Sequence, residues 1–175
     1  MSVSGLIQEA KKAYENKEYR QAAELFQNVA EQQISLGDPL MEAEMKNNCS
    51  VAWLQAGEPQ KSLDAVLGTD HVFAEANDPR RQAMALGNQA AALEALGTLS
   101  EAMDKYQTAA DIFKDIHEED LRAYVLKNLS ALQLRTGDQL QAIASMHTAL
   151  ENKKKLGLKE KFLKKFLRIP FKMLR

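Results

Sequence analysis

The sequence holds few of the residues on which many folds and chemistries depend. Its 175 residues include one cysteine, four prolines and eight glycines. One cysteine excludes an internal disulfide and is typical of a protein from a reducing compartment. Scarce proline and glycine, together with a hydrophobic share of 45%, argue against a disordered chain. Because Cys49 stands inside a predicted helix, we expect a buried structural thiol rather than a nucleophile.

Long apolar runs are also missing. The chain has no stretch of about 18 apolar residues, so we expect no transmembrane helix. Its first twelve residues have no apolar core after a basic start, so we expect no secretory signal. Both absences predict a cytoplasmic protein.

Motifs that are typical of catalytic or metal-binding sites do not occur either. The sequence contains no HExxH pair, no glycine-rich phosphate loop and no Cys/His spacing typical of zinc sites. Its three histidines, His71, His117 and His147, are far apart in the chain. We therefore expect no enzyme, no cofactor and no metal.

What the sequence does have is a repeat with a period of forty residues. Asparagine recurs at positions 48, 88 and 128, and glycine recurs at 57, 97 and 137. Three further positions in the repeat hold small residues: Ala10, Ser50, Ala90 and Ser130; Ala22, Ser62, Ala102 and Ala142; and Val29, Thr69, Ala109 and Ala149. A fixed period over four units is typical of stacked repeats, and small residues let neighbouring helices approach closely.

Each unit is predicted to be a pair of amphipathic helices. Helix ends are indicated at Gly37, Asn77, His117 and Gly157, which are forty residues apart and suit a left-handed cap. The pairs Asp38-Pro39 and Asp78-Pro79 are typical helix starts. The second helix of the second unit, predicted over 60–76, is interrupted by Gly68 and Thr69.

These features predict an all-α fold, a right-handed superhelical solenoid of four helix-turn-helix repeats with a capping helix at the C-terminus. The repeat domain is expected over 1–152, in units of about 1–38, 39–78, 79–118 and 119–152. Residues 153–175 form a separate basic, amphipathic segment. Each unit buries its apolar face against its neighbours.

The repeat resembles the tetratricopeptide repeat (TPR) family. Gly97, Ala102, Tyr106 and Ala109 match the family's pattern of a turn glycine, an alanine, an aromatic residue and a second alanine. The period of forty is similar to the long-helix variety of that family. The resemblance implies a protein–protein interaction scaffold or adaptor, whose concave groove binds a peptide or a helix of a partner protein.

In that architecture the first helix of each unit lines the groove. The repeat register then gives the groove-facing candidates, which form a mixed apolar surface suited to a peptide or an amphipathic helix. They are Lys11, Tyr14, Asn47, Val51, Leu54, Met84, Tyr124 and Lys127. The alternative is that several of them, Leu54 above all, simply pack between helices.

The charges are divided unevenly along the chain. Residues 153–175 carry a net charge of +9, and residues 1–152 a net charge of −10. A helix from Leu158 would place its apolar residues on one half of its circumference, and Pro170 would end it. The residues that could meet a membrane or a partner are Lys161, Phe162, Lys164, Lys165, Phe166 and Arg168.

Two interpretations of this tail remain open. It caps the last repeat, or it both caps the repeat and attaches the scaffold to anionic lipid as a peripheral protein at the inner membrane face. Nucleic acid is not an expected partner, because the basic run is short and the body is acidic. The division of charge also makes self-association through tail and body a hypothesis.

Overall fold

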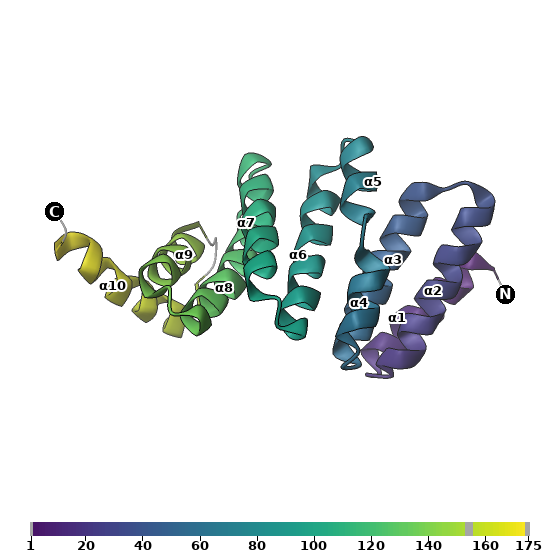
Figure 1. Ribbon diagram of the computed structural model, residues 1–175, viewed down its shortest axis with the longest axis horizontal. Coiled ribbons are helices and arrows are strands. Elements are labelled where there is room, and N and C mark those ends of the chain that lie inside the picture. The colour runs from purple at the N-terminus through teal and green to yellow at the C-terminus, as the bar shows by residue number, and fades with distance from the viewer. Residues whose placement is uncertain (1, 153–155, 174–175) are drawn as a thin grey trace.

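The computed structural model describes the backbone of residues 2–152 and 156–173, and the side chains of residues 2–151, 156–165 and 167. In these residues the chain is α-helical without strands (Figure 1). The helices are α1 (Val3–Glu15), α2 (Tyr19–Leu36), α3 (Pro39–Gln55), α4 (Pro59–Val66), α5 (Thr69–Glu75), α6 (Pro79–Leu96), α7 (Leu99–Asp115), α8 (Glu119–Thr136), α9 (Gln139–Asn152) and α10 (Leu158–Met173).

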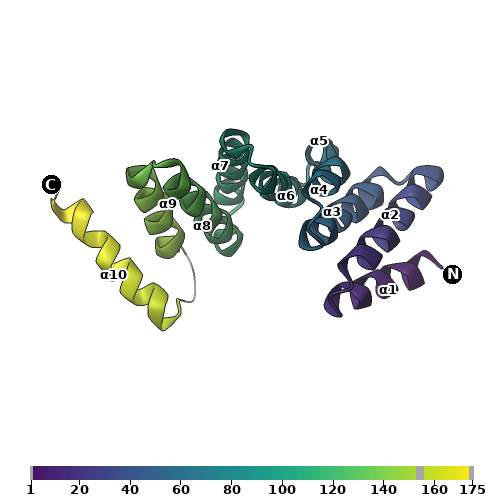
Figure 2. The same ribbon diagram turned by 60° about the horizontal axis from the view of Figure 1, so that its bottom comes forward.

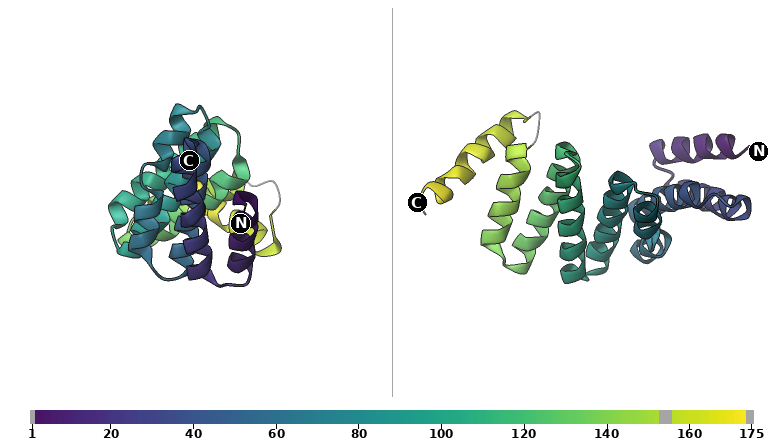
Figure 3. Two further views of the ribbon diagram at one scale, coloured as in Figure 1. Left: turned by 90° about the vertical axis from the view of Figure 1, so that its right-hand side faces the viewer. Right: turned by 90° about the horizontal axis from the view of Figure 1, so that it is seen from above.

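The helices form a row of antiparallel hairpins. Within the hairpins α1 packs on α2, α3 on α4 and α5, α6 on α7, and α8 on α9. Between hairpins α2 packs on α3, α4 and α5 pack on α6, and α7 packs on α8. Figure 2 shows the row as an arch, in which α1, α3, α6 and α8 lie toward the hollow side. The two termini lie at opposite ends of the row (Figure 3). The predicted solenoid of helical hairpins is confirmed.

The small residues of the repeat are where the helices meet. Ala10, Ala90, Ala22 and Ala102 have no exposed surface, and the serines that replace alanine in this pattern are buried as well. These serines satisfy their hydroxyls locally: Ser50 and Ser62 share a hydrogen bond of 2.9 Å, and Ser130 donates to the Ala142 carbonyl at 2.7 Å. Close packing of helices thus explains why these two positions of the repeat hold only alanine or serine.

The predicted helix ends are confirmed at three of four positions. Gly37, Asn77 and His117 adopt left-handed backbone conformations with φ of 71°, 54° and 59°. Gly157 does not adopt this conformation, and that prediction is wrong because α9 already ends at Asn152. Lys17 occupies the repeat position that holds glycine at 57, 97 and 137, and it has the same left-handed conformation, with φ of 65°. Glycine adopts this conformation without strain, whereas lysine does not.

The second hairpin departs from the others where the sequence is interrupted. Its outer helix breaks between α4 and α5, and Gly68 makes the turn with φ of 82°. The break frees the Val66 carbonyl, which accepts hydrogen bonds from the Thr69 hydroxyl at 2.8 Å and from the Gln89 amide at 3.4 Å. The same Gln89 nitrogen donates to buried Asp70 at 2.7 Å. The polar groups that the break exposes are therefore satisfied inside the protein.

Helix α10 packs against α9 and closes the C-terminal end of the row. Among the described side chains of α10, Leu167 is buried, with 8% of its surface exposed. The expected end of the helix at Pro170 is wrong, since α10 continues to Met173. Proline removes only its own hydrogen bond to the preceding turn, and the helix has only three residues after it.

Candidate binding groove

The inner side of the arch carries three hollows in a row. The first lies between α1 and α3, the second between α3 and α6, and the third between α6 and α8, with volumes of about 240, 370 and 170 Å³. Neighbouring hollows share lining residues: Asn48 and Val51 line the first and the second, and Met84 and Asn88 the second and the third. The hollows therefore form one groove along the first helices.

The first hollow combines aromatic and charged side chains. Lys11, Tyr14 and Glu15 of α1 face Asn48 and Val51 of α3 across it. The Tyr14 ring makes an edge contact with Tyr19, with 5.3 Å between the ring centroids. Burial, and then the neighbouring Tyr19, raise the pKa of Tyr14, so its hydroxyl stays protonated and can donate a hydrogen bond.

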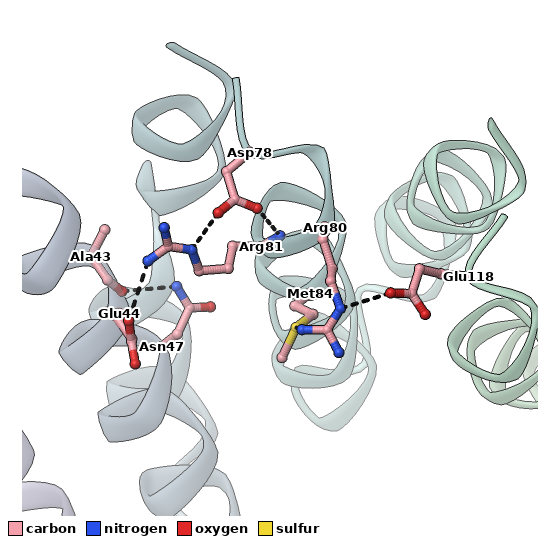
Figure 4. A network of polar contacts seen from close by, with 8 residues as sticks. All are labelled: Ala43, Glu44, Asn47, Asp78, Arg80, Arg81, Met84 and Glu118. Carbon is pink, nitrogen blue, oxygen red and sulfur yellow. Dashed lines mark hydrogen bonds and ion pairs between the residues drawn. The ribbon is translucent and has the colours of Figure 1, made fainter. Parts of the chain in front are cut away.

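The central hollow has two arginines at its edge, shown in Figure 4. Arg81 binds Asp78 at 2.6 Å and Glu44 at 3.2 Å, and its guanidinium lies 5.0 Å from the centroid of the Phe73 ring. Arg80 reaches across to Glu118 of the next hairpin at 2.9 Å. The two arginines thus tie three successive hairpins together around the hollow.

The charges at this edge are fixed by local hydrogen bonds. Asp78 caps the N-terminus of α6, where the backbone N–H of Arg81 donates to its carboxylate at 2.9 Å. That bond, together with the Arg81 guanidinium, lowers the pKa of Asp78, while the bond to Asp78 raises the pKa of Arg81. Both groups are therefore charged at neutral pH.

An amide chain forms the floor of the central hollow. Asn88 donates to the Asn47 side-chain oxygen at 3.1 Å, and Asn47 donates to the Ala43 carbonyl at 2.9 Å and to the Thr69 hydroxyl at 3.0 Å. Thr69 in turn donates to the carbonyl freed by the break between α4 and α5. The floor of the groove is therefore hydrogen-bonded to the irregular part of the second hairpin.

The third hollow is lined mostly by apolar and aromatic side chains. Its rim carries Tyr124, which is 67% exposed, and the partly exposed Met84, and its floor includes Tyr106 and Phe113. The Tyr106 hydroxyl donates to Glu94 at 3.3 Å. Burial raises the pKa of Tyr106, and the nearby Glu94 carboxylate raises it further. An exposed tyrosine beside an apolar hollow is typical of interface residues that dominate binding.

The structure brings most of the predicted groove residues together. Lys11, Tyr14 and Val51 line the first hollow, and Met84 and Tyr124 line the third. Asn47 lines the central hollow, but it is buried and its polar atoms are engaged. Leu54 is only partly exposed and lines none of the three.

The remaining predicted residues lie at the C-terminal end. Lys127 pairs with Glu160 of α10 at 3.6 Å. Lys161, Phe162 and Lys165 are exposed on α10, whereas Lys164 pairs with Glu151 of α9 at 3.3 Å. The side chains of Phe166 and Arg168 lie outside the described residues.

Several residues of the central hollow, Arg80, Arg81 and Phe73 among them, were not predicted as groove residues. Arg80 and Arg81 stand in the first turn of α6, where sequence reasoning saw only the start of a helix after Asp78-Pro79. Phe73 belongs to α5, an outer helix, and reaches the hollow from the side. The forty-residue register, which places Arg81 level with Leu121 of the third hollow, is the signal that could have found Arg81.

A larger hollow of about 660 Å³ lies outside this row, between α2, α3 and α4, with Trp53 and Cys49 among its lining residues. Cys49 is 2% exposed, and burial raises its pKa to about 11, so its thiol is protonated and inert at neutral pH. This larger hollow shares no lining residue with the three inner hollows. The inner hollows adjoin one another and can therefore engage an extended partner.

In the part of the chain that the structure describes, no group of three or more histidine, cysteine, aspartate or glutamate side chains could hold a metal ion. None of the described helices combines the length and the apolar character that a membrane span requires.

Comparison with known proteins gives a family match and a likeness to solved structures. The family model described as "Soluble NSF attachment protein, SNAP" matches residues 3–169. Among solved structures, the crystal structure of BtubC (BKLC) from P. vanneervenii is similar, with a TM-score of 0.75 and 17% identity over 90% of this chain and 68% of that chain. At this identity the likeness shows the fold alone. A comparison with curated proteins finds no match.

Proposed function

Because this chain belongs to the soluble NSF attachment protein (SNAP) family, a family of TPR-like helical repeats, we propose that it is a non-enzymatic adaptor. Its inner groove binds a peptide or helical segment of a partner protein. The observation that supports this most is the continuity of the three hollows along α1, α3, α6 and α8. We further propose that its repeat is the long, forty-residue variety and that it acts in the cytoplasm.

The chemistry of the groove indicates the kind of segment that it binds. Its charged groups are largely paired with each other, as in Arg81 with Asp78 and Arg80 with Glu118. The apolar rim residues Met84 and Tyr124 are exposed and have surface left to bury. A segment that presents apolar side chains to the hollows therefore fits better than a strongly charged one.

The experiment is a comparison of partner binding between two variants. The family name states attachment to NSF, so NSF is one bait, and unbiased affinity capture is the other. The groove variant combines Met84→Ala with Tyr124→Ala, and the control is Leu140→Ala, whose side chain is 82% exposed outside the groove. We expect the groove variant to lose at least about tenfold in affinity, since buried aromatic anchors cost about 2 kcal/mol or more when truncated.

Equal binding by both variants to every partner would refute the groove as the binding surface. A loss in the control alone would place the partner on the outer turns instead. Circular dichroism melting of both variants checks that neither change unfolds the chain.

A second candidate function is peripheral attachment of the scaffold to an anionic membrane through residues 153–175. The support for it is that α10 has apolar side chains that remain outside the solenoid although the helix caps it. This function would place the protein at the inner face of a membrane. Cell fractionation of the full chain, compared with a chain that ends at Asn152, tests it: the full chain should be enriched in the membrane fraction.

A further inference from the structure

The helix α10 is divided lengthwise into two faces. At about 100° per residue, Leu163, Leu167, Glu160 and Lys164 fall on one side. That side contacts the solenoid: Leu167 is buried, Glu160 pairs with Lys127 of α8 at 3.6 Å, and Lys164 pairs with Glu151 of α9 at 3.3 Å. The cap therefore uses a mixed face, with two charged residues that the sequence had assigned to the polar half.

The opposite side is exposed. Leu158 and Phe162, one turn apart, are 87% and 74% exposed. Lys159, Lys161 and Lys165 are exposed beside them, and among the described side chains none of these lysines forms an ion pair. Leu158 and Phe162 therefore do not pack on the last repeat. We call these five residues the outward face of α10.

The outward face combines two properties that capping does not require. Its two apolar side chains are exposed to solvent near the start of α10, and three lysines lie beside them. A partner that matches both has negative charge spread over a surface and an apolar layer immediately beneath it. An anionic lipid bilayer has this structure, with headgroups for the lysines and acyl chains for leucine and phenylalanine. Nucleic acid would match the charges but leave the apolar pair in water.

We propose that the outward face of α10, Leu158, Lys159, Lys161, Phe162 and Lys165, binds anionic membrane lipid while the other face of the same helix stays docked on the solenoid. This proposal rests on the second candidate function and names the residues that carry it. It excludes Lys164, which the sequence had grouped with the other lysines and which is held by Glu151.

The place of α10 in the row gives the attachment a direction. It lies at one end of an elongated molecule, at the opposite end from α1 (Figure 1). Lipid would therefore contact one end of the arch, and the first and central hollows would remain available to a partner protein. Lipid and partner binding are then independent of each other.

The test measures flotation of the full chain with phosphatidylcholine vesicles, with and without phosphatidylserine. The lysine variant carries Lys159→Gln, Lys161→Gln and Lys165→Gln. Its matched control loses the same charge at exposed positions elsewhere, by Lys12→Gln, Lys17→Gln and Lys114→Gln. Each lysine near an anionic surface contributes about fivefold in binding, so the lysine variant should partition about 10²-fold more weakly. The control should stay close to the unchanged chain, because charges beyond about 8 Å are screened at physiological salt.

Two further variants separate lipid binding from folding. Leu158→Ser with Phe162→Ser should abolish flotation without lowering the melting temperature, because neither side chain packs on the solenoid. Lys164→Gln should keep flotation within about the fivefold expected of one surface charge and should slightly destabilise the cap. Light scattering after gel filtration gives the oligomeric state of each variant.

Three outcomes would overturn the proposal. If the unchanged chain ignores anionic vesicles, both the second candidate function and the outward face are wrong. If the unchanged chain floats and the lysine variant floats equally well, attachment stands but this face is not the lipid site. If the serine variant turns an oligomer into a monomer, the outward face is an interface between copies of the chain.

Discussion

Substitution of Gln89 by leucine would test the account of the break in the second hairpin. Gln89 is buried in α6 and donates to Asp70, at the start of α5, and to the carbonyl that the break frees. Leucine has a similar size but no donor. Asp70, itself 6% exposed, would then keep its burial and lose its 2.7 Å hydrogen bond.

The cost follows from the charge on Asp70. A hydrogen bond to a charged group contributes about 1.5–3 kcal/mol, and a buried group left without its partner costs the upper part of this range. We expect the free energy of unfolding to fall by about 3 kcal/mol. With a urea dependence of about 2 kcal/mol per molar, the midpoint falls by about 1.5 M. Trp53 is the single tryptophan of the chain and lies in α3, which packs on α4 and α5, so its fluorescence reports on this part of the molecule.

Two controls decide whether the hydrogen bond is responsible. Gln107→Leu removes an exposed amide–carboxylate contact of the same kind, to Asp111 at 3.0 Å, and should cost less than about 0.5 kcal/mol. Asp70→Asn removes the charge, so Gln89→Leu should cost at least about 1 kcal/mol less in that background. The reasoning is refuted if Gln89→Leu costs no more than Gln107→Leu, or costs the same in both backgrounds.

A helix cap, two glycines and the buried thiol allow three more predictions. Asp78→Ala removes the cap of α6 and should lower the free energy of unfolding by about 1 kcal/mol at neutral pH, measured as a lower urea midpoint. Because the pKa of Asp78 is lowered in the folded protein, the difference in midpoint between the two proteins should be complete above about pH 4 and shrink as pH falls further. Gly97→Ala forces alanine into φ of 83° and should destabilise by about 1 kcal/mol, whereas Gly87→Ala, inside α6 with its nearest neighbour 4.0 Å from the added Cβ, should stabilise by about 0.5–1 kcal/mol in the same thermal melts. A thiol reagent at pH 8 should leave Cys49 unmodified in the native protein and react once urea exposes it, and rapid native labelling would contradict the burial and the pKa of about 11.

The sequence predicts what depends on local geometry and on spacing. Helix caps at Gly37, Asn77 and His117 require only a residue that tolerates a left-handed conformation, and the small positions require only that two helices meet. The faces of α10 are different, because periodicity gives the angles between its side chains but not the rotation of the helix on the solenoid. That rotation depends on contacts between residues distant in sequence, such as the ion pair of Lys127 with Glu160. In the orientation that results, Leu158 and Phe162 are exposed.

The central hollow could not be predicted for a related reason. Its lining includes Phe73 from an outer helix, and its floor is held by Thr69, and both positions depend on how the break turns the chain at Gly68. The second unit is also where the repeat pattern is weakest, with Ser62 and Val66 in place of the expected alanine and aromatic residue. A regular outer helix there would leave neither the free carbonyl for Gln89 nor the hydroxyl for Asn47. The irregularity thus costs helical continuity and gives the groove a polar floor of fixed geometry, in line with the rule that local departures from a pattern concentrate where a protein binds.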